Sequence, residues 1–231
     1  MLTLVIDTST STSCVALTKN GKILTEYISN TDKNHSETLV PRIDTVLKNA
    51  NIKPKDLSRI IVAKGPGSYT GVRIGVTVAK TLAWTLKVPL YSISSLEVIA
   101  SSVEHFHGIV IPIVDARRNT VYTSAFETVN GKLNQLNEET HVSIEEWAGI
   151  WKKSNKRVLW IGSDVFKFKD VITEIMGDQA IFAPEYLNVP RLSKIEYILG
   201  NRDEENIHAF VPEYAKLAEA EAKWLEAQNN K

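Results

Sequence analysis

The feature that most constrains the fold is a pattern that occurs twice along the chain. The apolar run Leu2–Asp7 ends in aspartate, and the turn Asn20-Gly21-Lys22 follows a second apolar stretch. The run Ile109–Asp115 also ends in aspartate, and the turn Asn130-Gly131-Lys132 follows a strand expected over Thr120–Val129. Asn-Gly between apolar runs is typical of a tight β-hairpin. The sequence therefore predicts a duplicated β-β-β-α-β-α unit.

Hydrophobic periodicity predicts the other elements. In the first half we expect strands and helices over Cys14–Thr18, Ile23–Ile28, His35–Ala50 (helix), Ile60–Ala63, Tyr69–Lys87 (helix) and Leu90–Ile93. In the second half we expect helices over Ile144–Lys153, Phe166–Met176, Ser193–Gly200 and Pro212–Gln228, with a strand over Val158–Gly162.

Two such units, each with an aspartate at the end of its first strand, suggest the fold shared by actin, sugar kinases and Hsp70-type ATPases. We therefore predict an α/β protein of two duplicated actin-like (ASKHA, ribonuclease H-like) lobes with mixed sheets. Polarity rises near Ser101–His107. This places the expected boundary between an N-terminal lobe, 1–104, and a C-terminal lobe with a terminal helix, 105–231.

Charge and composition exclude several classes of function. The 231 residues carry 27 acidic and 27 basic side chains, so the net charge is zero. A protein that binds nucleic acid by itself needs clustered Lys and Arg, so the zero net charge argues against this class. The single cysteine, Cys14, excludes an internal disulfide and a cysteine-rich metal site. No apolar run approaches the length of a membrane span, so we expect a cytoplasmic protein.

The segment Lys64–Gly75 joins a predicted strand to a long predicted helix. Gly65 and Gly67 allow a sharp turn, and Ser68 or Thr70 can cap the helix. The order of residues fits neither a nucleotide-binding P-loop nor a nucleophile elbow. A structural or interfacial role is favoured, and contact with an anion is the alternative.

Small residues recur every four positions along the helix that follows. Gly71, Gly75, Ala79 and Ala83 share one face, so another backbone can approach it closely. The spacing does not say whether that neighbour is the protein's own sheet or a second subunit.

A search for catalytic groups finds few candidates. Asp7 and Asp115 stand at strand ends where a carboxylate could meet Mg²⁺, and a turn cap is an equally good explanation. Arg117 and Arg118 could bind an anion, although an Asp–Arg turn network is the commoner arrangement. The second half has no Gly-rich run, and no two histidines have the spacing of metal ligands on a helix.

At this point the chain resembles the TsaB (YeaZ) family. The matching residues are Ile6-Asp7-Thr8-Ser9, His35-Ser36-Glu37 with Leu39 and Pro41, Gly65–Gly75, and Asp115-Ala116-Arg117-Arg118 with Val121-Tyr122. The resemblance covers both halves and implies the actin-like fold. It also implies a role in making threonylcarbamoyladenosine (t6A), a modified adenosine beside the anticodon of some tRNAs.

Members of that family are not themselves the transferase. The resemblance implies a noncatalytic subunit that pairs with a TsaD-type catalytic subunit and is joined by a TsaE-type ATPase. We expect a homodimer when the chain is alone, tRNA binding only through the complex, and no membrane partner. TsaD-type subunits carry a His-x-x-x-His pair on the matching helix, whereas here Leu39 follows His35. We therefore expect no catalytic residue and no metal.

The resemblance also implies where the partner binds. The family pairs through the two helices of its N-terminal lobe, which gives the expected interface His35, Leu39, Ile43, Val46, Gly71, Gly75, Ala79 and Ala83. No resident cofactor is implied, and a nucleotide at the subunit junction would contact Asp7, Gly65, Gly67, Ser68 and Arg117.

Two points stay open. The family often has Pro-x-Tyr-Leu-Arg near its end, where this chain has Pro212-Glu213-Tyr214-Ala215-Lys216. Lys216 keeps the charge but lacks the planar fork of arginine. The rival function is an autonomous ATP-dependent kinase or peptidase of the same fold.

Overall fold

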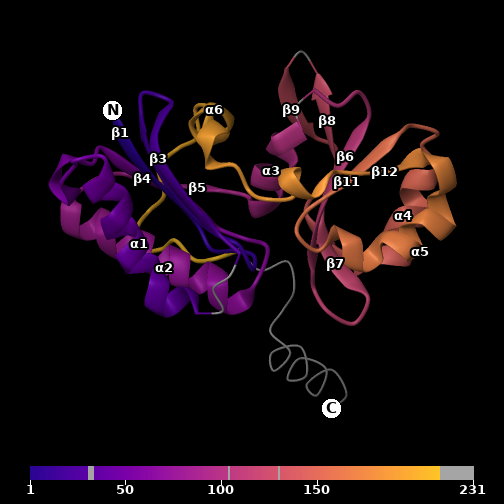
Figure 1. Cartoon of the computed structure of the whole chain (residues 1–231), viewed down its shortest axis with the longest axis horizontal. Coiled ribbons are helices and arrows are strands. Elements are labelled where there is room, and N and C mark those ends of the chain that lie inside the picture. The colour runs from indigo at the N-terminus through magenta and orange to yellow at the C-terminus, as the bar shows by residue number, and fades with distance from the viewer. Residues whose placement is uncertain (31–33, 104, 130, 214–231) are drawn as a thin grey trace.

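The structure consists of two lobes, each with a β-sheet at its centre (Figure 1). It is a computed structural model that describes residues 1–30, 34–103, 105–129 and 131–213. Among these residues no helix is long and apolar enough to cross a membrane.

The N-terminal lobe contains a five-stranded mixed sheet in the order β3-β2-β1-β4-β5. β1 is the central strand; it pairs antiparallel with β2 and parallel with β4. The strands are β1 (Leu2–Asp7), β2 (Ser13–Lys19), β3 (Lys22–Ser29), β4 (Arg59–Ala63) and β5 (Leu90–Ile93). Asn20 and Gly21, which join β2 to β3, both have positive φ (52° and 78°), as the predicted hairpin requires.

The C-terminal lobe repeats this order around β6, in the sequence β10-β7-β6-β11-β12. β6 pairs antiparallel with β7 and parallel with β11, as β1 does with β2 and β4. The strands are β6 (Ile109–Asp115), β7 (Thr120–Thr123), β8 (Phe126–Val129), β9 (Lys132–Gln135), β10 (Thr140–Ser143), β11 (Val158–Ile161) and β12 (Ala180–Phe182). The predicted duplication is therefore present in the topology, and the β8–β9 hairpin is an addition to the second copy.

The predicted strand Thr120–Val129 is broken at Ser124 and Ala125. β7 pairs with the end of β6 and β8 with its beginning, so the break lies opposite Ile111 and Pro112. Pro112 has no N–H to donate to a ladder. The Thr123 hydroxyl instead donates to the Pro112 carbonyl at 2.9 Å, and the chain leaves the sheet for two residues.

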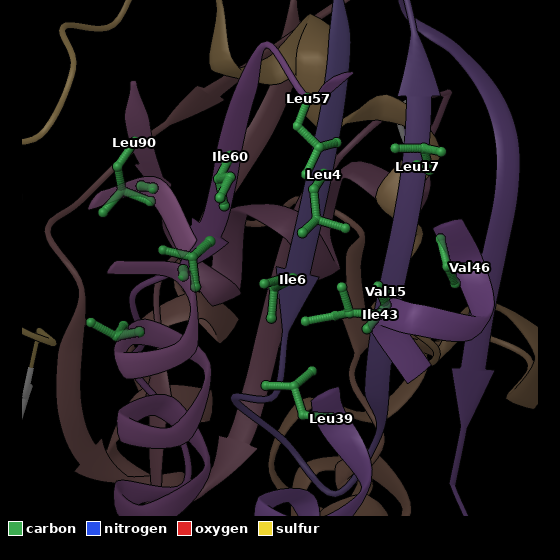
Figure 2. Close-up of a cluster of buried hydrophobic side chains, with 14 of the residues drawn as sticks. Leu4, Ile6, Val15, Leu17, Leu39, Ile43, Val46, Leu57, Ile60 and Leu90 are labelled. Carbon is green, nitrogen blue, oxygen red and sulfur yellow. The ribbon is translucent and has the colours of Figure 1, made fainter. Parts of the chain in front are cut away.

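One face of each sheet is covered by a pair of helices. α1 (His35–Asn49) and α2 (Tyr69–Leu86) pack on the N-terminal sheet, and Figure 2 shows their core around Leu4, Ile6 and Val15. α4 (Ile144–Lys152) and α5 (Lys169–Met176) cover the C-terminal sheet. Helix bounds follow the predictions to within a few residues, because the apolar spacing marks each buried face.

The other face of each sheet is covered by a segment that crosses from the opposite lobe. α3 (Ser95–Ala100) follows β5 and packs on the C-terminal lobe against Val110 and Val114. α6 (Ile195–Leu199) follows the C-terminal strands and packs on the N-terminal sheet against Val5 and Ile61. Both helices lie between the two sheets in Figure 1.

The chain after α6 also belongs to the N-terminal lobe. The Glu205 N–H donates to the Leu90 carbonyl at 2.7 Å, and Phe210 lies in the core beneath α2. A boundary at residue 104 therefore separates 192–213 from the lobe on which these residues pack, because the return is a long-range contact without a local signal. The predicted helix Pro212–Gln228, with Lys216, falls outside the described residues beyond Glu213.

Candidate functional site

The aspartate that ends β1 is buried. The carboxylate Oδ1 of Asp7 accepts hydrogen bonds from the Ser9 backbone N–H at 2.8 Å and from the Ser9 hydroxyl at 2.7 Å. Its Oδ2 has no hydrogen-bond partner among the described residues. Burial raises the pKa of the Asp7 carboxyl, while the two bonds from Ser9 and the nearby His35 oppose that rise. Asp7 thus acts as a turn cap that faces the protein interior.

The loop after Asp7 is covered by the Gly-rich loop before α2. The Ser68 N–H donates to the Ser9 carbonyl at 2.7 Å. A Cβ at Gly67 would lie 2.1 Å from that same carbonyl oxygen, so only glycine fits there. Of the two predicted caps, Ser68 and Thr70, it is Ser68 that caps α2, because its side chain accepts from the Gly71 N–H at 3.2 Å. Two N–H groups that could have held an anion are thus bound to the protein's own oxygen atoms.

The first glycine of this loop contacts the returning C-terminal segment. Gly65 has φ +107°, and a Cβ at this position would lie 2.6 Å from the Glu213 carbonyl oxygen. The Glu213 N–H donates to the Lys64 carbonyl at 2.9 Å, and the two side chains form an ion pair at 2.8 Å. The loop is therefore closed from outside as well.

Arg117 lies on the other lobe, in the exposed turn between β6 and β7. Arg117, Arg118 and Asn119 all have positive φ (67°, 51° and 61°). The Arg117 N–H donates to Asp115 Oδ1 at 2.7 Å, and Lys167 Nζ pairs with Asp115 Oδ2 at 3.0 Å. The predicted anion contacts Asp7, Gly65, Gly67 and Ser68 thus lie on two adjoining loops of the N-terminal lobe, whereas Arg117 belongs to the C-terminal lobe.

The row of small residues on α2 faces the protein's own sheet. A Cβ at Gly71 would lie 2.1 Å from the Thr8 carbonyl oxygen, and one at Gly75 would lie 2.5 Å from Thr8 Oγ1. The Thr8 hydroxyl donates to the Gly71 carbonyl at 2.7 Å. This close approach between α2 and the end of β1 is the reason for the small side chains.

The structure therefore corrects the expected partner interface. Seven of its members are buried inside the lobe and cannot meet a second subunit: Leu39, Ile43, Val46, Gly71, Gly75, Ala79 and Ala83. The apolar spacing on α1 and α2 marks the face of each helix that packs on the sheet. His35 is half-buried, and its Nε2 hydrogen-bonds to the Thr10 carbonyl at 3.0 Å, which ties the start of α1 to the loop after β1.

The opposite face of α2 is exposed and carries little charge. Within its 18 residues the charged side chains are Arg73 and Lys80. The solvent side presents threonines and an indole, and Trp84 is 64% exposed. The face is formed by Thr70, Arg73, Thr77, Thr81, Trp84 and Thr85, which we call the threonine face. A sequence search for exposed helix faces with few charges would have found it.

In the described part of the chain, no three His, Cys, Asp or Glu residues form a group that could hold a metal ion. Cys14 is buried in β2, and burial raises the pKa of its thiol. It packs as a small apolar residue.

Comparison with known proteins shows the family. A family model described as TsaD, tRNA N6-adenosine threonylcarbamoyltransferase, matches residues 22–224. Two solved structures from Pseudomonas aeruginosa share the fold at 24% sequence identity. YeaZ has a TM-score of 0.77 over 92% of this chain and 99% of that chain, and a protein described as similar to peptidase YEAZ has 0.79 over 93% and 99%. The molecule is thus a two-lobed actin-like protein built on a TsaD-type domain, and the predicted fold class is confirmed.

Within that class the chain belongs to the TsaB family. It is 42% identical to the tRNA threonylcarbamoyladenosine biosynthesis protein TsaB of Bacillus subtilis, over 99% of this chain and 100% of that protein. TsaB of Buchnera aphidicola (subsp. Schizaphis graminum) is 32% identical over 72% of this chain and 80% of its own length. The predicted resemblance is therefore confirmed.

Proposed function

We propose that this protein is a noncatalytic subunit in t6A biosynthesis that binds and activates a TsaD-type transferase. The names of its TsaB relatives and the extent of the match to them support the pathway. The match to a TsaD-type domain supports the partner, because related domains often pair through equivalent surfaces.

The main support for pairing with a TsaD-type subunit is the threonine face of α2. A helix on the surface of a soluble protein ordinarily turns a charged face to water. Here Thr77, Thr81 and Trp84 take those positions, and the cores of protein interfaces are likewise poor in charge and rich in aromatic residues. Val40 of α1 is also exposed, so both helices named by the family resemblance offer apolar contact.

The closed loops support a noncatalytic role. Asp7 is buried, and burial raises the pKa of its carboxyl. The loop that contains Gly67 and Ser68 is hydrogen-bonded to the Ser9 carbonyl. The described residues thus present no solvent-facing carboxylate at the end of β1 that could hold Mg²⁺. The alternative, an autonomous ATP-dependent kinase or peptidase of this fold, has less support for the same reason.

The proposal includes the rest of the assembly. A TsaE-type ATPase joins the pair, and a nucleotide would bind at the junction of subunits rather than in this chain alone. Alone in solution the chain forms a homodimer through the threonine face, in the cytoplasm. tRNA binds only through the complex, since the net charge of zero offers little attraction for phosphates.

A pair of matched substitutions tests the interface. Thr81 and Thr173 are both exposed and both donate their hydroxyl to a carbonyl one turn earlier at 2.8 Å. Thr81→Glu should weaken binding to a TsaD-type subunit by about tenfold or more, because a desolvated charge in an interface costs upward of ~1.4 kcal/mol. Thr173→Glu on α5 should leave binding unchanged. Size-exclusion and calorimetry measure the pairing.

Activity is measured as t6A formed on tRNA by the reconstituted TsaD-type, TsaE-type and TsaB-family proteins. This chain alone should form none, and the mixture should lose activity when it is omitted. Equal partner affinity for the two glutamate variants would exclude the threonine face. Turnover of ATP by this chain alone that disappears in Asp7→Ala would overturn the noncatalytic assignment.

A further inference from the structure

The net charge of zero is the sum of two unequal parts of the chain. Residues 1–103 contain 12 basic and 7 acidic side chains, whereas residues 104–231 contain 15 basic and 20 acidic ones. The first part therefore carries a charge of +5 and the second a charge of −5. Such an asymmetry is one sign of an interaction with a polyanion, either a nucleic acid or a membrane surface.

Five exposed lysines lie along one edge of the N-terminal sheet, at the end of β1 that carries the N mark in Figure 1. Each lies at the end of a strand or in the link that leads into one, and together they accompany four of the five strands. They are Lys19 in β2, Lys22 in β3, Lys53 and Lys55 before β4, and Lys87 before β5. We call these five residues the lysine edge.

The register of the sheet brings these lysines into one row. Lys19 is the partner of Lys22 on one side and of Leu2 on the other. The Leu2 carbonyl accepts from the Ser58 N–H at 2.8 Å, and Ser58 belongs to the link that carries the next two lysines. Adjacent strands lie about 4.8 Å apart, so five strands give an edge of roughly 19 Å. A row of this length can meet several successive phosphates of one nucleic-acid strand.

The residues around the lysine edge do not neutralise it. Within the described ranges, none of its five ammonium groups forms an ion pair. Asp56 caps its own turn, since its Oδ2 accepts a backbone N–H at 3.1 Å, and Glu204 lines a cavity together with Lys87. Near the end of α1, Asp44 pairs with Lys48 at 2.7 Å. Six lysines against these three carboxylates leave a charge of +3.

One end of the lysine edge adjoins the threonine face of α2. Lys87 is the C-cap of α2 and lies three residues beyond Trp84. Its φ is 57°, a left-handed conformation in which glycine is the usual residue. A long cationic side chain thus stands where the backbone favours glycine. An RNA held by a partner on the threonine face would lie within reach of the lysines.

We propose that the lysine edge binds the phosphate backbone of tRNA. The choice of tRNA as the polyanion rests on the proposed function, since the t6A pathway modifies tRNA. The ammonium groups contact phosphates and read no bases, so they position the tRNA without selecting its sequence. Because such contacts weaken steeply with salt, the edge alone holds tRNA weakly at physiological salt and adds to the affinity of the whole complex.

The first test measures tRNA binding to the chain alone at about 20 mM salt, where phosphate contacts are strongest. The variants are Lys19→Gln/Lys22→Gln and Lys53→Gln/Lys55→Gln. Each pair should weaken binding by about tenfold or more, and should reduce the slope of log K against log [salt] by about two. Circular dichroism checks that each variant is folded.

A matched control removes the same charge from the other lobe. Lys152→Gln/Lys153→Gln changes two exposed lysines at the end of α4 and should leave the affinity and the salt slope as in the wild type. An equal loss in this control would mean that affinity follows net charge, and would overturn the proposal. Vesicles that contain phosphatidylserine test the other polyanion. If the edge variants lose binding to vesicles while the wild type binds no tRNA, the edge serves a membrane surface and the proposal is wrong.

The second test uses the reconstituted t6A reaction. Each edge pair should raise the KM for tRNA by about tenfold, and the α4 control should not. If the wild-type mixture forms no t6A, the proposed function fails, while binding at low salt still decides the role of the lysine edge. Two further results would overturn the proposal: no binding of tRNA by the wild-type chain at low salt, or the same affinity and salt slope in both edge variants as in the wild type.

Discussion

Asp7 shows how a residue that suggests catalysis can be structural. The position at the end of β1 is where this fold class can place a metal-binding carboxylate, yet here the side chain turns inward and caps the loop through Ser9. The carboxylate is buried, and its Oδ2 has no hydrogen-bond partner among the described residues. Burial therefore raises the pKa of Asp7 above its usual value. Asp7 thereby makes the stability of the protein depend on pH.

Asp7→Asn should remove that dependence. The pKa of Asp7 is raised above 3.8 in the folded state, so the folded protein binds more protons than the unfolded chain between 3.8 and the raised value. The contribution of Asp7 to stability therefore falls as pH rises through this window and is fully lost above it. The free energy of unfolding of the wild type minus that of Asp7→Asn should grow as pH is lowered from 7 to 4. Denaturant titrations measure it, and parallel pH profiles for the two proteins would refute the prediction.

At the scale of elements, α2 combines two opposite faces. One face carries glycine and alanine because the helix lies against the end of β1, and the other carries threonine and tryptophan where a surface helix ordinarily has charge. The first face packs against the N-terminal sheet, and the second is exposed at the place where we propose that the partner binds. Substitutions on the two faces should therefore have separable effects on folding and on binding.

Gly75→Ala should destabilise the protein by about 1–3 kcal/mol, since its Cβ would lie 2.5 Å from Thr8 Oγ1 and displace a buried hydroxyl. Gly149, inside α4, is a matched control because a Cβ there meets nothing within 4 Å. Gly149→Ala should instead stabilise the protein by roughly 0.5–1 kcal/mol through helix propensity. Urea unfolding gives both values. A Gly75→Ala protein as stable as the wild type would mean that α2 does not lie this close to β1.

At the scale of the whole molecule, the two lobes exchange segments. α3 leaves the first lobe to cover the second sheet, and α6 with the chain up to Glu213 returns to the first. The Ser94 and Glu139 side chains, from opposite lobes, are hydrogen-bonded across the seam. Neither half of the sequence therefore contains a complete lobe.

Phe210→Ala tests this exchange. Phe210 is 7% exposed in the N-terminal core, and its removal should destabilise that lobe by about 3–5 kcal/mol. The adjacent Val211 is 68% exposed, so Val211→Ala should change stability by less than about 0.5 kcal/mol. Hydrogen exchange should show protection lost in α2 and β5 first. If protection were lost only in β11 and β12, the segment around Phe210 would pack on the C-terminal lobe, and the prediction would be refuted.

The sequence by itself determined most of the local structure. Apolar spacing gave the strands and the long helices, Asn20-Gly21 gave a hairpin, and Ser68 gave a helix cap, because these depend on neighbours within a few residues. The duplicated aspartate-terminated strands also gave the fold class. Pro112 shows where prediction from local sequence ends. It lies opposite the break between β7 and β8, and that position is known only from the register of the sheet.

What only the tertiary structure decided is which surfaces meet. Periodicity shows that Gly71 and Gly75 share a helix face, but a row of small residues suits a sheet and a second subunit equally well. The same is true of Leu39 on α1, which proved to be core, and of residues 192–213, whose return to the first lobe has no local signal. Burial is a property of distant contacts, and the sequence states only which residues are able to make them.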